Sequence, residues 1–572
     1  MVSFTRRLTR WLSLGLFILS FCFDGKLLAL KSGEGDNSVK NSSTSILKEV
    51  GALSKIDFPE IWTEISKKIV GNPLPLMTIE GKNLQKVCQK VTELVDKILP
   101  ESASLISLAI MGFAGGLPCP GVDENAACYV VIFLHEGRIE PVFLFKASMD
   151  SLLVKNLNEV KNTRNVLKTI QNDDLKKFCW QMYGNSELIK VLDKDVKQFF
   201  PFIYASKPSE MCLKISLNFD NLNEIFEKIE DGKCAFFKFL WNMFFVPDIK
   251  KIEMCGDIEG KTLHAETRIY PQDSSSLSTF VKSLETKNKD VHFLDWSSRE
   301  MIQKCEFQDY LGGKNYIKFL DARMKYRHRV TEYAQFKNFW EIFYPLIEDI
   351  LTFCSENLTG NTQSYADLQN SNGLGSLKSF GFLETKKLNQ TTFLGFMQGM
   401  VKKVSAFFSA MTDKKCFCWE FCKDLSLNVK KSVEKHCGYG IDLIFWKTQT
   451  QEAYCPIWFT VCKNYLLYAD NIDDLKRLIE RMLEKKSMLY QDSYKNGVNR
   501  IQINWGAIMH SLGFEKIPLG SEMLMEMTYG AHEGIWTNTI RMPNFLDVFS
   551  VKTGLPLSKG NDKNGAVNRL DK

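Results

Sequence analysis

The chain has 572 residues, enough for two to four domains, and 45% of them are hydrophobic, so buried cores can form. Its 73 basic and 67 acidic residues leave a formal net charge of +6, a bias too small to attract polyanions over long range. Composition and charge therefore give no indication of a nucleic-acid partner.

The N-terminal residues 1–29 have the pattern of a secretory signal peptide. An uncharged apolar run extends from Trp11 to Phe23, and three basic residues precede it: Arg6, Arg7 and Arg10. The run is short for a bilayer span, and Ala29 offers a cleavage edge. We therefore expect an exported protein, periplasmic or secreted, with a retained N-terminal anchor as the alternative. No later segment predicts a stable transmembrane span.

The next segments predict a spacer and a helical lead-in. Residues 30–56 are mostly small and polar, which is typical of a flexible spacer. Residues 57–100 predict two helices, Phe58–Val70 behind the N-cap Asp57 and Lys82–Leu99 before Pro100.

Residues 101–290 predict a first unit of strands and helices. Ala126–Leu134 and Ile139–Lys146 flank a four-residue turn containing Gly137, the pattern of a buried hairpin, and a helix follows at Met149–Leu157. Further on, Met211–Phe226 changes from strand to helix pattern, and Glu253–Pro271 predicts a second hairpin.

Residues 291–425 predict a connecting helical region. A long helix is expected over Lys314–Phe353 with a basic patch at residues 323–329, followed by a surface loop at Asn357–Ser376 and a third hairpin at Leu377–Met397. A stripe of Phe and Met side chains that begins at Phe393 has helical spacing and predicts core rather than a lipid-binding face.

Residues 426–555 repeat the order of the first unit. Tyr439–Trp446 and Pro456–Ala469 predict strands, Asp470–Leu483 an amphipathic helix, and Asn499–Phe514 a strand that runs into a helix. A hairpin at Glu526–Pro543 follows, and residues 556–572 predict a disordered tail.

The two units share details of sequence as well as order. Their last hairpins both begin with Glu-Met, contain Glu-Gly at the turn, and carry an arginine, Arg268 or Arg541, shortly before a proline. We therefore predict an α+β fold of duplicated units, each a mainly antiparallel sheet with packed helices, after a helical lead-in.

The densest group of metal-ligand or disulfide residue types is Cys416, Cys418 and Cys422, with Cys437 downstream. A structural zinc site would need a second closely spaced pair, which the sequence lacks, although His436 or Cys437 could join the group. Export favours a disulfide among these four cysteines, and buried thiols are the remaining interpretation. No cofactor is predicted.

The sequence offers no convincing catalytic motif. The Lys552–Gly554 tripeptide matches one wall of a serine β-lactamase site, but the Ser-x-x-Lys candidate that starts at Ser45 lies in the polar spacer. His135 and His532 each begin a His-Glu-Gly turn without the second histidine of a zinc protease helix. We therefore name no catalytic residue.

The chain resembles large exported bacterial proteins of unknown function in which a signal peptide precedes duplicated α+β units. The resemblance is carried by Ile139–Leu157, by Asn464–Met482 and by the paired Glu-Met hairpins. It implies export and duplication, and supplies no catalytic residues.

The expected function is that of an exported, non-catalytic binding or scaffold protein of the cell envelope, whose partner is an unidentified protein or polymer. The 41 phenylalanines suggest a carrier of a hydrophobic ligand or lipid as the alternative. An uncharacterised envelope enzyme is the third interpretation.

Overall fold

The computed structural model describes only part of the chain. The described residues are 73–89, 92, 119–159, 164–170, 177–204, 213–221, 223, 248–285, 291–294, 301–307, 345–346, 348–350, 352–368, 377–413, 426–447, 454–484, 489–492, 499–504, 506 and 524–545. The predicted signal peptide, spacer, first helix and C-terminal tail lie outside the described residues, as do the basic patch and the domain boundaries near residues 100, 290 and 425.

The main structure is one 18-stranded sheet in which every described strand pair is antiparallel. From one edge its first eight strands are β4 (Asn165–Ile170), β5 (Cys179–Asn185), β3 (Arg138–Ala147), β2 (Cys128–His135), β1 (Leu74–Gly81), β6 (Leu213–Asn218), β7 (Ile249–Glu259) and β8 (Thr262–Pro271).

The remaining strands continue the same sheet beyond β8. They are β20 (Ile535–Met542), β19 (Leu524–His532), β18 (Asn499–Asn504), β10 (Met301–Phe307), β11 (Leu358–Leu368), β12 (Leu377–Thr385), β16 (Tyr465–Ala469), β15 (Tyr454–Cys462), β14 (Tyr439–Lys447) and β13 (Ser426–His436). A second, two-stranded sheet pairs β9 (Val291–Leu294) with β17 (Leu489–Asp492). The predicted mixture of helices with antiparallel sheet is confirmed.

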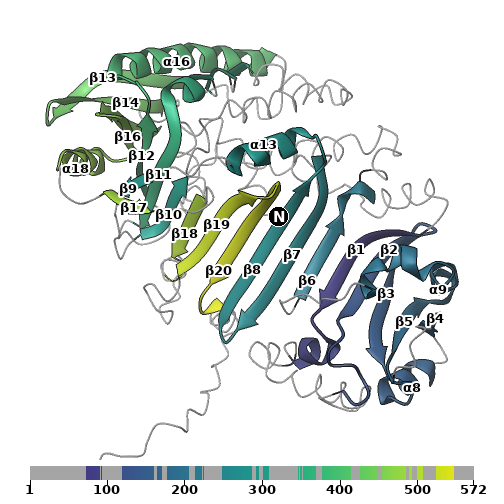
Figure 1. Ribbon diagram of the computed structural model, residues 1–572. Helices are drawn as coiled ribbons and strands as arrows, with labels where there is room; N and C mark the ends of the chain where they lie inside the picture. The colour runs from purple at the N-terminus through teal and green to yellow at the C-terminus, as the bar shows by residue number, and fades with distance from the viewer. Residues whose placement is uncertain are drawn as a thin grey trace, which may run out of the picture.

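Helices pack on both faces of the outer parts of the sheet (Figure 1). On one face, α9 (Ser186–Leu192), α10 (Val196–Phe199) and the 3₁₀ turn η1 (Pro201–Tyr204) cover β2, β3 and β5, and α18 (Ile472–Leu483) covers β12 and β16. On the opposite face lie α8 (Leu152–Glu159) and α16 (Gln390–Asp413). The hydrophobic cores are therefore sandwiched between sheet and helices.

Helix α18 confirms the helix predicted at Asp470–Leu483. The Asn471 side chain caps it by accepting a hydrogen bond from the Asp473 backbone N–H at 2.8 Å, and acidic residues in its first turn favour the positive end of the helix dipole. Its buried face consists of Leu475, Leu478, Ile479 and Met482, together with Asp474.

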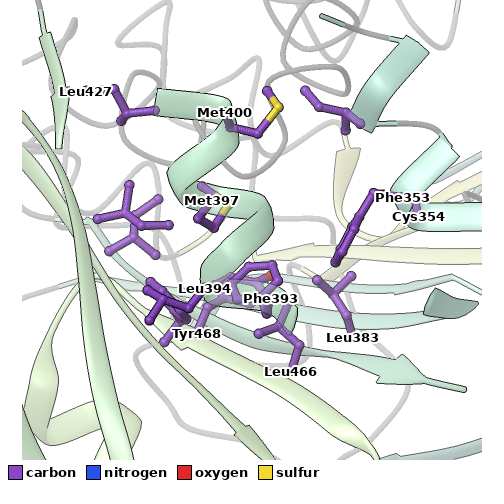
Figure 2. Packing of buried hydrophobic residues seen from close by; sticks show 14 of the residues in the cluster. Phe353, Cys354, Leu383, Phe393, Leu394, Met397, Met400, Leu427, Leu466 and Tyr468 are labelled. Carbon is purple, nitrogen blue, oxygen red and sulfur yellow. The ribbon is translucent and has the colours of Figure 1, made fainter. Parts of the chain in front are cut away.

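Helix α16 carries the predicted stripe of Phe and Met side chains into the largest core (Figure 2). Phe393, Met397, Met400 and Val404 are all buried, at the spacing of one helical face. The ring of Phe353, on an adjoining short helix, stacks on Phe396 with centroids 3.8 Å apart. The prediction that this stripe is core is confirmed.

The predicted lead-in is not wholly helical, because Leu74–Gly81 forms strand β1. The strand lies between β2 and β6, and only residues 84–89 of the predicted Lys82–Leu99 helix form a continuous described helical stretch. Its proline, Pro75, and its mixed sequence give no clear strand signal. The pairing with two distant strands decides its conformation.

The surface loop predicted at Asn357–Ser376 is also wrong, because Leu358–Leu368 is strand β11. This strand is polar in composition, yet Thr362 and Gln363 are buried and the ring of Tyr365 stacks on Phe380 at 5.2 Å. Pairing with β10 on one side and β12 on the other provides hydrogen-bond partners for the backbone N–H and C=O groups of β11. This pairing outweighs the turn-like composition of the strand.

The third hairpin predicted at Leu377–Met397 is instead a strand followed by a helix. Strand β12 ends at Thr385, and α16 begins at Gln390. The segments Ile139–Leu157 and Asn464–Met482 each contain a strand followed by a helix, but their strands occupy different positions in the sheet. Strand β3 lies between β2 and β5. Strand β16 lies between β12 and β15, the place that β5 occupies between β3 and β4.

Two glycine substitutions test the packing between β12 and its neighbours. A Cβ on Gly381 would lie 2.4 Å from the backbone oxygen of Gln363 and 2.6 Å from the Tyr468 hydroxyl, whereas a Cβ on Gly395 in α16 would contact nothing within 4 Å. We expect Gly381→Ala to lower the free energy of unfolding by about 1–3 kcal/mol through overpacking. Gly395→Ala should raise it by roughly 0.5–1 kcal/mol, because alanine favours helix.

Urea unfolding followed by circular dichroism measures both changes. Equal stability of Gly381→Ala and the unmodified protein would contradict the described packing of β12.

Candidate binding face of the central strands

The central strands β6, β7, β8, β20, β19 and β18 place most of their charged side chains on one face. Residues directly opposite each other in antiparallel strands share a face, and alternate residues of one strand share it too. We call this surface the junction face and define it by Lys214, Ser216, Lys251, Glu253, Asp257, His264, Glu266, Arg268, Tyr270, Arg500, Gln502, Glu526, Thr528, Thr537, Thr539 and Arg541.

Glu253 is the most enclosed charge of the junction face, with a side chain only 5% exposed. Its carboxylate oxygens lie 3.0 Å from Lys214 Nζ and 2.5 Å from Lys251 Nζ, and the Tyr270 hydroxyl donates to it at 2.8 Å. Burial by itself would raise the pKa of this carboxyl. The hydrogen bonds from Lys251, Lys214 and Tyr270 together outweigh that effect and lower the pKa to about 2.

The other ion pairs of the junction face are more exposed to solvent than Glu253. Arg268 donates two hydrogen bonds to Glu266, at 2.8 and 3.0 Å, and Arg500 Nε lies 2.6 Å from Glu526 Oε1. The hydrogen bonds that Arg268 donates to Glu266 raise the pKa of Arg268. Thr528 and Thr539 share a hydrogen bond between their hydroxyls.

The junction face is accessible at its centre. The Arg268 and Lys251 side chains are each 43% exposed, and Thr539 and Arg541 are exposed as well. The opposite face of the same strands is mainly apolar, and the helix α13 (Ser276–Glu285) lies against it, where Phe280 meets Trp536 edge to face (Figure 1). The two faces therefore differ in chemistry.

Two directly opposite pairs of Glu and Arg residues lie on either side of the centre of the junction face. Glu253 lies directly opposite Arg268 in one hairpin, and Glu526 lies directly opposite Arg541 in the other. The two hairpins join where β8 pairs with β20, and Glu266 faces Thr539 there.

The sequence contained a signal for this face that its interpretation did not use. Both hairpins alternate polar and apolar residues, and the shared Glu-Met and Arg positions indicate a repeat but do not by themselves indicate a site. The two-residue turn is Gly260–Lys261 in one hairpin and Glu533–Gly534 in the other. The Glu-Gly sequence therefore lies one position earlier relative to the turn in the first hairpin than in the second. With these registers the Glu and the Arg lie directly opposite each other in both hairpins.

The predicted cysteine site is described only at Cys437. Cys416, Cys418 and Cys422 lie outside the described residues, so their relation to Cys437 stays a prediction. Cys437 is an exposed free thiol in the two-residue turn between β13 and β14, where its φ is 49°. Nε2 of the neighbouring His436 lies 2.8 Å from Oε1 of Glu480 in α18.

The described residues contain no group of three or more His, Cys, Asp or Glu residues placed to hold a metal ion. No helix in the described ranges has both the length and the apolar character needed to cross a membrane.

Comparison with protein-family models, curated proteins and solved structures finds no match to this chain. The function must therefore be argued from the geometry of the chain itself.

Replacing Glu253 by glutamine tests the electrostatics of the junction face. Because the folded-state pKa is lower than the unfolded value, the ionised carboxylate contributes stability above pH ~4.5, and this is lost as the pH falls toward 2. We expect Glu253→Gln to lower the free energy of unfolding by roughly 3 kcal/mol at pH 7.

Urea unfolding at pH 7, 4 and 3 measures the effect, which should shrink as the pH falls. Glu526→Gln is the matched control, because its more exposed pair with Arg500 should contribute about 1 kcal/mol or less. A Glu253→Gln effect as small as that of the control, or independent of pH, would refute the described network.

Proposed function

We propose that this chain is an exported, non-catalytic binding or scaffold protein of the cell envelope, and that the junction face binds its partner. One observation carries the proposal: half-buried side chains of both charges, together with the exposed Arg541 and Thr539, lie on a broad antiparallel sheet whose backbone is held by its own pairing. Such a surface is ordered before binding, which reduces the entropy lost on association.

The charges favour a protein as the partner over a charged polymer. A polyanion is best bound by a surface of one sign, because neutralised phosphates or sulfates release counterions. The junction face instead mixes five Lys or Arg residues with four Asp or Glu residues: Lys214, Lys251, Arg268, Arg500, Arg541, and Glu253, Asp257, Glu266, Glu526. Mixed charges give register and specificity against a protein surface of complementary pattern.

The state of Glu253 supports a binding role rather than catalysis. A general acid or base works best when its pKa lies near the operating pH. A carboxyl with a pKa of about 2 stays ionised and is fully engaged by two lysines and a tyrosine. We therefore assign Glu253 a positioning role for the charges around it.

We also propose that the sheet comprises two copies of one α+β unit. Glu526 follows Glu253 by 273 positions (526 − 253), and Arg541 follows Arg268 by the same number (541 − 268). The order of elements supports the same relation once the unmatched α10, η1 and β17 are set aside: β1, β2, β3, α8, β4, β5, α9, β6, β7, β8 in one half and β10, β11, β12, α16, β15, β16, α18, β18, β19, β20 in the other. Hairpin β13–β14 is then an insertion in the second half.

The carrier of a hydrophobic ligand remains a weaker alternative. The suggestion came from the phenylalanine content, but the Phe and Met side chains of α16 fill a core. Within the described residues no observation favours a bound lipid over this packing. Organic extraction of the purified protein followed by mass spectrometry would detect a co-purifying lipid.

An experimental structure tests the duplication. We expect the Cα atoms of β6, β7 and β8 to superpose on those of β18, β19 and β20, with Glu253 on Glu526 and Arg268 on Arg541. A superposition that needs a shifted register, or a different strand order, would contradict a common unit.

Site-specific photo-crosslinking tests the binding role. A photo-reactive amino acid at Thr539, at the centre of the junction face, should trap one predominant protein partner in cells that produce the full chain. The same amino acid at Lys190, an exposed position of α9, is the matched control and should not trap it.

The charges provide a second arm of this experiment. Arg268→Glu combined with Arg541→Glu should reduce the Thr539 crosslink at least about tenfold, since like charges brought together at an interface cost affinity. Equal crosslinking from Lys190 and Thr539, or a crosslink that is insensitive to charge reversal, would rule out the junction face.

A further inference from the structure

Two cysteines outside the predicted cluster lie at the contact between a helix and a loop near β1 and β2. Cys88 lies in the helical residues 84–89 that follow β1, and Cys119 begins the described segment that leads into β2. Leu84 and Val87 of the helix pack against the core that contains Cys119. The two cysteines therefore belong to segments that are packed together.

Specific hydrogen bonds hold the helix against the loop. Asn83 caps the helix, since its side-chain oxygen accepts from the Lys86 backbone N–H at 2.7 Å. Its Nδ2 donates at 2.8 Å to the backbone oxygen of Glu124 in the loop. On the loop side, the Val122 N–H donates to the Cys119 carbonyl at 3.2 Å and forms a turn. Asn83 thus fixes the helix and the loop relative to each other.

The helix also packs closely against the end of β1. A Cβ on Gly81 would lie 2.5 Å from Val87 Cγ2 and 2.8 Å from the sulfur of Cys128, the first residue of β2. Within this close packing, the side chains of Cys88 and Cys119 are hydrogen-bonded to each other. Cys119 is buried, whereas Cys88 is partly accessible.

We infer that Cys88 and Cys119 are a thiol pair that forms a reversible disulfide, closed by a small-molecule disulfide oxidant and locking the helix after β1 to the loop before β2. Both are free cysteines, and their side chains interact, as expected for the reduced state of such a pair. This inference does not depend on the junction face or on the proposed partner.

The two thiols have different roles in the exchange. The hydrogen bond from Cys119 lowers the pKa of Cys88 to about 7, so a large fraction of Cys88 is thiolate at neutral pH. The same contact raises the pKa of Cys119, which stays protonated while the Cys88 thiolate is beside it. The accessible Cys88 is therefore the attacking sulfur, and the buried Cys119 is the resolving one.

The reaction with oxidised glutathione balances in two steps. The Cys88 thiolate attacks one sulfur of oxidised glutathione, forming a mixed disulfide and releasing one glutathione thiolate, which takes up a proton. Cys119 then loses its proton and attacks the Cys88 sulfur, releasing the second glutathione. The capped Cys88 no longer carries the charge that raised the Cys119 pKa. Two protein thiols are oxidised, and one glutathione disulfide is reduced to two thiols.

The experiment uses the reduced full-length protein with oxidised glutathione, followed by alkylation and peptide mapping without reduction. We expect a linked peptide pair joining Cys88 to Cys119 in most molecules, and its loss on adding dithiothreitol. If both cysteines are recovered as separate alkylated peptides, the inference is overturned.

Single substitutions separate the two roles. Cys119→Ser should trap Cys88 as the glutathione mixed disulfide, because the resolving thiol is gone, whereas Cys88→Ser should leave Cys119 unmodified. Cys179→Ser is the matched control, because Cys179 is also a partly exposed free thiol, and it should leave the linked pair intact.

The alkylation rate of Cys88 against pH gives a measurement that does not require the disulfide. In the unmodified protein its midpoint should lie near pH 7, and Cys119→Ser should move it toward the ordinary cysteine value, roughly one unit higher or more. A midpoint that is unchanged by Cys119→Ser would show that the two thiols do not interact, and the inference would fail.

Discussion

The pairing of β8 with β20 is the contact on which the rest of the structure depends. It joins strands that are far apart in the chain, and it makes one sheet of what would otherwise be two. Because antiparallel neighbours fix which side chains lie opposite each other, this single register also places Glu266 against Thr539 and brings the two Glu and Arg hairpins together. The outer cores would survive without it, since α9 and α18 cover separate parts of the sheet. The junction face would not exist.

The division of the sheet into differently covered regions explains why the centre is the candidate site. At both ends the sheet carries helices on each face, and side chains such as Phe133 and Phe459 are fully enclosed. In the middle, one face carries paired charges in place of an apolar layer. Burying Glu253 is tolerated because three donors surround it, and an unpaired carboxylate there would be costly. The charges that remain exposed, such as Arg541, are those that a partner could contact.

The thiol pair belongs to a different part of the molecule and to a different kind of chemistry. Cys88 and Cys119 lie beside the β1–β2 end of the sheet, where the helix is held by Asn83 and by close packing over Gly81. A covalent bond there would restrict the unfolded chain and the local opening of the helix, but would not change the register of the sheet. Binding at the junction face and redox state at the thiol pair can therefore vary independently.

The sequence by itself determined the elements whose signal is local: the hairpins of β2 with β3 and β19 with β20, the capped helix α18, and the apolar stripe of α16. Periodicity and turn residues specify these because each is stabilised by contacts close in the chain. Only the tertiary structure decided β1 and β11, because the single proline, the polar residues and the glycines of these strands resemble a loop until neighbouring strands on both sides accept their backbone hydrogen bonds. The same holds for the candidate site. The repeated Glu and Arg were visible in the sequence, but long-range pairing alone placed them on one face, because register between distant strands leaves no trace in local composition.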